Sequence, residues 1–210
     1  MKKLISGIVE FRKGLTEEKR ELFARLALGQ KPDALFIACS DSRVVPNLFA
    51  STNPGDLFVI RNIGNLVPRS SCCESSISAA LEFSIYSLKI KDIIVCGHSE
   101  CGAMIALCEN QQELKEVARW LNHAKEALTH LDGDSKLSTH NELSLKNVLL
   151  QIDHLRSYPF IKKREEEGTL RLHGMWFDIA RADVYFYDEK SKSFELIDEI
   201  YSKKILEKLL

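Results

Sequence analysis

The sequence predicts an α/β fold, with a mainly parallel central β-sheet flanked by helices, an N-terminal helical arm and a C-terminal helix. Three short apolar runs, at residues 34–39, 56–61 and 92–97, are typical of strands buried on both faces of a parallel sheet. Residues 77–88, between the second and third runs, have helical periodicity and are expected to form the crossover that joins two parallel strands.

The elements outside this unit follow from the same periodicities. Apolar side chains recur at helical spacing from residue 5 to residue 30, with a fresh turn starting at Thr16, so we expect a helical arm in two pieces. The remaining elements are expected to be surface helices at residues 113–131 and 141–156, strands at residues 170–176 and 182–187, and a final helix. We expect a single domain over residues 1–210, with residues 1–30 as its arm.

Composition excludes several classes of function. The 210 residues carry a net charge of −1 without any block rich in lysine and arginine, which argues against nucleic acid as the main partner. No stretch approaches the roughly 18 to 20 apolar residues of a membrane span. The charged start lacks the features of a signal peptide, and six cysteines in such a chain favour reduced thiols or metal ligands. We therefore expect a cytoplasmic protein that acts on a small molecule.

Two polar clusters follow the first and third predicted strands. Cys39 to Arg43 reads CSDSR, and His98 to Cys101 reads HSEC. Ligands bind at the carboxyl ends of strands in open α/β sheets, so we expect both clusters at one crevice. If a helix begins at the second cluster, His98 and Cys101 are neighbours on its first turn. With Cys39 they offer two thiolates and one imidazole, which leaves the fourth position of a tetrahedral zinc ion open, as in catalytic sites.

Other interpretations of these residues remain open at this point. A single cysteine that ends a buried strand is usually a small core residue. A phosphatase-like nucleophile at Cys39 would need an arginine six positions later, where Val45 stands. Asp41 and Arg43 flank Ser42, and an ion pair between them would keep Asp41 ionised and oriented toward the crevice. Without a metal, the same pair would be an ordinary salt bridge in a surface loop.

An ordered set of motifs resembles the β-class carbonic anhydrases. The set consists of CSDSR at residues 39–43, RNIGN at residues 61–65 and GHSECGA at residues 97–103. No single motif is decisive, but the set in this order is highly specific. The resemblance continues through residues 157–160 and 172–178, covers nearly the whole chain, and is strongest to bacterial members such as the anhydrase that accompanies cyanase.

The resemblance implies an activity and a set of site residues. The reaction would be the reversible hydration of carbon dioxide to bicarbonate by zinc-bound hydroxide. Asp41 would accept a hydrogen bond from the hydroxide, and Arg43 would fix Asp41. The matching positions are Cys39, His98 and Cys101 as ligands of one Zn²⁺ ion per subunit, and Gln30, Phe58 and Gly102 as substrate-binding residues.

The resemblance also bears on regulation and assembly. Members with a regulatory bicarbonate site carry a tryptophan three residues before the first cysteine, where this chain has Phe36, so we expect the non-allosteric type. The arm is expected to wrap a second subunit in a homodimer or homotetramer. The segment before the crossover helix departs from the glycine-rich pattern of relatives, and we expect Cys72 and Cys73 to be reduced loop thiols.

Two rival functions remain compatible with the motifs. The first is a hydrolase for carbon disulfide or carbonyl sulfide, because relatives with the same metal site use such substrates. The second is a non-catalytic protein that binds zinc or bicarbonate, in which Asp41 occupies the fourth metal position permanently. Arg43 argues against the second rival, because it is expected to hold Asp41 away from the metal.

Overall fold

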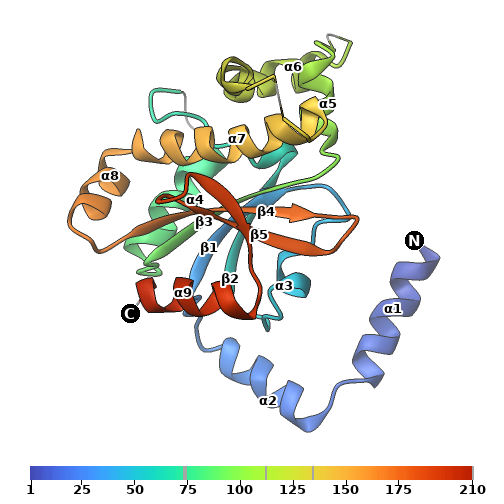
Figure 1. The fold of residues 1–210 in the computed structure, drawn as a ribbon. Coiled ribbons are helices and arrows are strands. Elements are labelled where there is room, and N and C mark those ends of the chain that lie inside the picture. Colours follow the sequence, from blue (N-terminus) through green and yellow to red (C-terminus); the bar gives the residue numbers. More distant parts are fainter. Residues whose placement is uncertain (73–74, 112, 134, 210) are drawn as a thin grey trace. The chain divides into compact units, whose positions relative to one another are not determined.

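The computed structural model describes residues 1–72, 75–111, 113–133 and 135–209, and it forms two compact units, Met1–Lys31 and Pro32–Leu210 (Figure 1). The first unit contains helices α1 (Lys2–Lys13) and α2 (Glu17–Leu26). The second contains, in chain order, β1 (Ala34–Cys39), α3 (Pro46–Phe49), β2 (Leu57–Asn62), the 3-10 turn η1 (Ile63–Asn65), α4 (Ser76–Tyr86), β3 (Asp92–His98), α5 (Gly102–Cys108), α6 (Lys115–Leu121), the 3-10 segment η2 (Asn122–His130), α7 (Thr139–Arg156), α8 (Pro159–Glu166), β4 (Arg171–Asp178), β5 (Asp183–Asp188), β6 (Ser193–Leu196) and α9 (Glu199–Leu209).

The N-terminal arm consists of two helices, as its periodicity predicts. Thr16 caps α2, since its hydroxyl oxygen accepts a hydrogen bond from the backbone N–H of Lys19 at 3.3 Å. Phe11 and Phe23 join the two helices by an edge-to-face contact with ring centroids 6.1 Å apart. No residue of either helix is buried within the single chain. The arm therefore presents an apolar stripe that its own unit does not cover.

A six-stranded sheet organises the second unit in the order β2-β1-β3-β4-β5-β6. The first four strands are parallel, and β5 and β6 add to β4 as antiparallel strands. The register aligns Cys39 with Asn62 and His98 with Phe177, so β1 to β4 end at a common edge. The predicted mainly parallel sheet is confirmed, and both polar clusters follow strands that end at this edge.

Side chains alternate between two cores on the two faces of the sheet. Leu35 and Ile37 of β1 pack in one core with residues of α4 and α7, which both cover that face (Figure 1). Phe36 and Ala38 point to the other face, where they meet Phe49 of α3. Each buried residue of β1 thus has an apolar partner on its own face, which explains why this strand reads as a continuous apolar run.

The structure corrects four details of the predicted elements. Strand β2 is only half-buried, because it lies at the edge of the sheet with a neighbour on one side. Helix α7 is a buried helix rather than a surface one, with ten buried residues. Residues 113–131 form the short α6 followed by η2, and not one helix. Strand β6 was not expected. Among the described residues, no helix combines the length and apolarity needed to cross a membrane.

Candidate metal centre

Three buried side chains meet at the common edge of the parallel strands. Cys39 is the last residue of β1, His98 is the last residue of β3, and Cys101 lies immediately before α5. Their ligand atoms all lie within 4.8 Å of one another. The predicted convergence of the two clusters is therefore confirmed, and it brings one imidazole and two thiols from the ends of two parallel strands into a single cluster.

The imidazole of His98 is set up to bind a metal ion. Its Nδ1 lies 2.8 Å from the carbonyl oxygen of Ser99, a contact that requires Nδ1 to carry the proton and donate. In that tautomer Nε2 has a free lone pair, and this atom is buried with no hydrogen-bond partner among the described residues. A buried polar atom without a partner is costly, and a metal ion bound by Nε2 would remove that cost. The residues present therefore fit a zinc ion.

The two thiols differ in their acidity. The hydrogen bond between the thiols of Cys101 and Cys39 is the largest cause that lowers the pKa of Cys39, to about 4, and it outweighs the opposing effect of burial. The backbone N–H of Gly64 also donates to Cys39 Sγ, at 3.4 Å, and lowers the pKa further. The same thiol contact and burial raise the pKa of Cys101. Cys39 is thus the thiol that loses its proton more easily, and the charge of a bound divalent metal would favour loss of the proton from Cys101 as well.

A bidentate ion pair between Arg43 and Asp41 lies beside the metal ligands. Arg43 donates from Nε to Asp41 Oδ1 at 3.0 Å and from Nη2 to Asp41 Oδ2 at 2.7 Å. The backbone N–H of Arg43 adds a third hydrogen bond to Oδ1 at 2.9 Å. The side-chain hydrogen bonds from Arg43 are the main cause that holds the pKa of Asp41 well below its usual range. Asp41 is therefore an acceptor only, as the sequence predicts.

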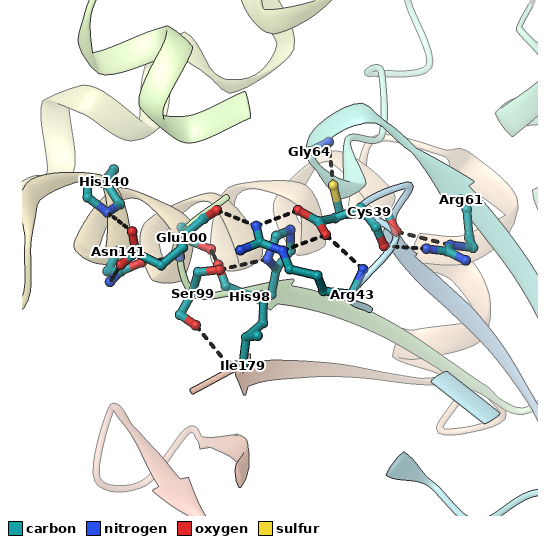
Figure 2. A network of polar contacts seen from close by, with 12 residues as sticks. Cys39, Arg43, Arg61, Gly64, His98, Ser99, Glu100, His140, Asn141 and Ile179 are labelled. Atoms are coloured by element: carbon teal, nitrogen blue, oxygen red, sulfur yellow. Dashed lines mark hydrogen bonds and ion pairs between the residues drawn. The ribbon is translucent and has the colours of Figure 1, made fainter. Parts of the chain in front are cut away.

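Arg61 holds the loop that carries Asp41. Its Nε donates to the carbonyl oxygen of Cys39 at 3.1 Å and its Nη2 donates to the carbonyl oxygen of Asp41 at 2.7 Å (Figure 2). The RNIGN motif thus contributes twice to the centre, because Arg61 fixes the backbone on both sides of Ser40 and Gly64 donates to the cysteine sulfur. Gly64 has a φ of 78°, in the left-handed region that favours glycine.

Comparison with known proteins identifies the family. The profile of the carbonic anhydrase family matches residues 34–184. A carbonic anhydrase of Pseudomonas aeruginosa is 40% identical over 204 residues, which cover 95% of this chain and 93% of that protein. The solved structure of the β-carbonic anhydrase CcaA superposes with a TM-score of 0.88 at 38% identity, covering 95% of this chain and 92% of that one. The chain belongs to the β-class carbonic anhydrases.

This assignment fixes the activity and the metal. The chain is a carbonic anhydrase that hydrates carbon dioxide, and Cys39, His98 and Cys101 form the zinc-binding triad typical of the β class. A further solved structure, one of two tetrameric β-carbonic anhydrases from the filamentous ascomycete Sordaria macrospora, is 28% identical with a TM-score of 0.77, and the match covers 87% of this chain and 94% of that one. β-Class enzymes thus form oligomers, of which this relative is an example.

The sequence did not reveal that α7 fastens the loops of this β-carbonic anhydrase. Polar side chains recur every three or four residues along one side of α7 and bond to the backbone of the loops around the zinc site. The hydrogen bonds are Asn141 with Glu100, Ser144 Oγ to the carbonyl of His98 at 2.9 Å, Asn147 Nδ2 to the carbonyl of Gly64 at 3.1 Å, and Gln151 Oε1 from the N–H of Val67 at 2.8 Å. The regular spacing of these polar residues was the available signal, but it is also typical of an exposed helix face.

The three predicted substrate-binding residues have different positions in this anhydrase. Gly102 begins α5 next to Cys101, and a Cβ built there would meet none of the described atoms within 4 Å, so the backbone is open at this point. Phe58 pairs with Leu35, four residues before the register position of Cys39, which places it about 13 Å along the strand from its own metal ligands. Gln30 belongs to the unit Met1–Lys31. Their roles in the pocket stay predictions.

Proposed function

We propose that Asp41 and Arg43 form the catalytic dyad with which this enzyme converts carbon dioxide and water to bicarbonate and a proton. The observation that carries the proposal is the two-pronged ion pair at the metal ligands, with contacts of 2.7 and 3.0 Å. Exposed ion pairs contribute little on average. This pair has bidentate geometry, and the Asp41 side chain is only 16% exposed, which supports a positioning function for Arg43.

The chemistry of the proposed dyad follows from its hydrogen bonds. When zinc is bound, it acts as a Lewis acid that lowers the pKa of water toward neutrality. Arg43 keeps Asp41 ionised and occupies lone pairs of both carboxylate oxygens, so Asp41 cannot act as a proton donor. A remaining lone pair accepts a hydrogen bond from the reacting oxygen and orients that oxygen toward carbon dioxide. Arg43 also keeps Asp41 from occupying the open ligand position itself.

We further propose the non-allosteric type of regulation. Position 36, three residues before the first ligand, is a buried phenylalanine that packs against Phe49 in the core on its face of the sheet. Its side chain offers no hydrogen-bond donor, unlike the tryptophan of members with a regulatory bicarbonate site. The pairing of Arg43 with Asp41 supports the same proposal, since the proposed dyad depends on this pairing.

We propose that the enzyme is a homodimer or a homotetramer in which the arm of one copy packs on another. Apolar residues of α1 are 46–63% exposed in the single chain, namely Leu4, Ile5, Ile8, Val9 and Phe11. A groove of about 410 Å³, lined by apolar residues that include Phe36, Leu57 and Met175, offers a surface for a second copy. The distance of Phe58 from its own ligands suits a pocket shared between subunits, to which Phe58 and Gln30 would contribute.

Two thiolate ligands need reduced cysteines, which supports a cytoplasmic location.

The test is stopped-flow carbon dioxide hydration by protein of verified zinc content, from pH 6.5 to 9. We expect turnover that rises with pH and falls at least a hundredfold in both Asp41→Ala and the isosteric Asp41→Asn, since Asn lacks the charge. Unchanged turnover in both variants, with full zinc content, would remove Asp41 from the mechanism. Faster turnover of carbon disulfide or carbonyl sulfide than of carbon dioxide would favour a sulfur-substrate hydrolase instead.

A further inference from the structure

Glu100, between the two ligands of the second cluster, has a backbone conformation that needs support. Its φ of 53° lies in the left-handed region, which non-glycine residues rarely adopt. Asn141, near the start of α7, bonds to Glu100 twice. Asn141 Oδ1 accepts from the backbone N–H of Glu100 at 2.7 Å, and Asn141 Nδ2 donates to the Glu100 carboxylate at 2.9 Å. Both the backbone and the side chain of Glu100 are therefore fixed by one residue.

The carbonyl oxygen of Glu100 accepts a hydrogen bond from the guanidinium of Arg43. The NH2 group of Arg43 donates to this oxygen at 2.9 Å and also to Asp41 Oδ2. Figure 2 shows Arg43 on one side of Glu100, with Asn141 and His140 on the other (Figure 2). The Arg43 side chain is 48% exposed, so packing alone does not hold it. The orientation of its guanidinium depends on where the Glu100 carbonyl points.

We propose that Asn141 is a positioning residue for the reaction, which fixes the peptide of Glu100 and through it the Arg43–Asp41 pair. This inference rests on the proposed function, because it assigns Asn141 a role through the dyad. Asn141 itself touches neither the substrate nor the metal. It sets the direction of the Glu100 carbonyl, and this carbonyl sets the plane of the guanidinium that holds the Asp41 carboxylate.

Asn141→Ala removes both hydrogen bonds to Glu100. Asn141→Asp keeps an acceptor for the backbone N–H but places a second carboxylate against that of Glu100. Adding Glu100→Gln to Asn141→Asp restores the side-chain bond with reversed polarity, since the Gln amide then donates to the Asp carboxylate, while the backbone N–H keeps its acceptor. Lys146→Ala is the matched control, because it removes a 2.6 Å side-chain hydrogen bond from the same helix, to Asp132, away from Glu100.

Two readouts are measured on the zinc-loaded enzyme. The first is turnover of carbon dioxide by stopped flow. The second is the Nε–H signal of Arg43 in protein labelled with ¹⁵N-arginine, assigned by its loss in Arg43→Lys. This proton is held by Asp41 at 3.0 Å in the wild type and exchanges slowly with water as a result. We expect Asn141→Ala and Asn141→Asp to lower turnover about tenfold and to raise the exchange rate of this proton at least tenfold. The double variant should restore both, and Lys146→Ala should change neither.

The outcomes separate this inference from the proposed function. Unchanged Arg43 exchange and turnover in Asn141→Ala would overturn the role of Asn141, even if Asp41→Ala abolishes turnover and the dyad stands. Unchanged turnover in Asp41→Ala would overturn the dyad. If Asn141→Ala fails to fold, the comparison passes to Asn141→Asp with and without Glu100→Gln, and a double variant no better than the single one would overturn the inference.

Discussion

The close approach of β3 to α7 can be tested by adding one methyl group at Gly97. A Cβ at this position would lie 2.8 Å from Val148 Cγ2 and 3.0 Å from Ser144 Oγ. Carbon atoms in contact are ordinarily about 3.5 Å apart or more, so the strand and the helix would have to separate by about 0.7 Å. Val148 is completely buried and cannot turn toward solvent. Both elements lie in a close-packed core, where such a shift is resisted.

We expect Gly97→Ala to lower the free energy of unfolding by about 2 kcal/mol, within the usual cost of overpacking. This cost corresponds to about a thirtyfold change in the folding equilibrium. The effect should reach the metal, because Ser144 donates to the carbonyl of His98, and a displaced Ser144 would loosen that ligand. Zinc should therefore leave the variant faster than it leaves the wild type.

The assay is urea unfolding followed by circular dichroism at fixed protein and zinc concentrations, with zinc release measured by a chromogenic chelator. Val148→Ala removes the methyl group that the new Cβ would contact. The loss of unfolding free energy in the double variant should therefore be smaller than the sum of the two single losses by at least about 0.5 kcal/mol. A Gly97→Ala variant within about 0.5 kcal/mol of the wild type, or a double variant with simply additive losses, would refute the packing argument.

Three further predictions follow from the site and the sheet. Arg43→Lys should lower carbon dioxide turnover about tenfold at unchanged zinc content, since an ammonium cannot form the two-pronged contact with Asp41; equal turnover by stopped flow would contradict this. Burial raises the pKa of Asp92, but hydrogen bonds from His173 and Arg171 outweigh it and lower the pKa to about 2, against 3.8 when unfolded. A lowered pKa stabilises the fold at pH values above the unfolded-state pKa, and this stabilisation is lost as the pH falls through the folded-state pKa. Asp92→Asn should therefore lower the free energy of unfolding in urea by about 2 kcal/mol at pH 7 and by about half of that at pH 3; a cost independent of pH would refute this. Removing zinc with a chelator should lower the thermal midpoint by an amount equivalent to about 1–3 kcal/mol, because Nε2 of His98 then lies buried with no partner in the described part of the chain, and added zinc should restore the midpoint.

The buried strands and the ligand set could be predicted because their signals are local. Strand β1 spans the apolar run at residues 34–39, and β3 extends its run by one residue to His98. The crossover helix between the second and third runs predicts that β2 and β3 run parallel in one sheet, and β1 lies between them. The convergence of the zinc ligands then follows from the shared edge of the sheet, which needs no knowledge of any side-chain contact.

The errors arose where long-range contacts decide the structure. Helix α7 carries polar residues at helical spacing, and a helix with that pattern usually exposes them. Here Asn147 and Gln151 are buried, because the loop after β2 supplies backbone partners for their amides. Strand β6 is short and half-buried, and pairs only with β5, so no local pattern marks it. Cys72 is exposed and forms no disulfide among the described residues, and Cys73 lies outside them, so the prediction that both are reduced loop thiols stays a prediction.

Because the loops after β2 and β3 are fastened to α7 by direct hydrogen bonds, the zinc site does not depend on the length of the turn that leads into α7. The connection from η2 to α7 passes through Gly133, an exposed turn residue with a φ of 74°, and a Cβ built there meets no atom of the described residues within 4 Å. Lengthening a flexible surface loop costs little, since the closure entropy grows only with the logarithm of its length. The turn at Gly133 is therefore the place where this anhydrase would best accept an inserted peptide or a fused domain while keeping its metal geometry.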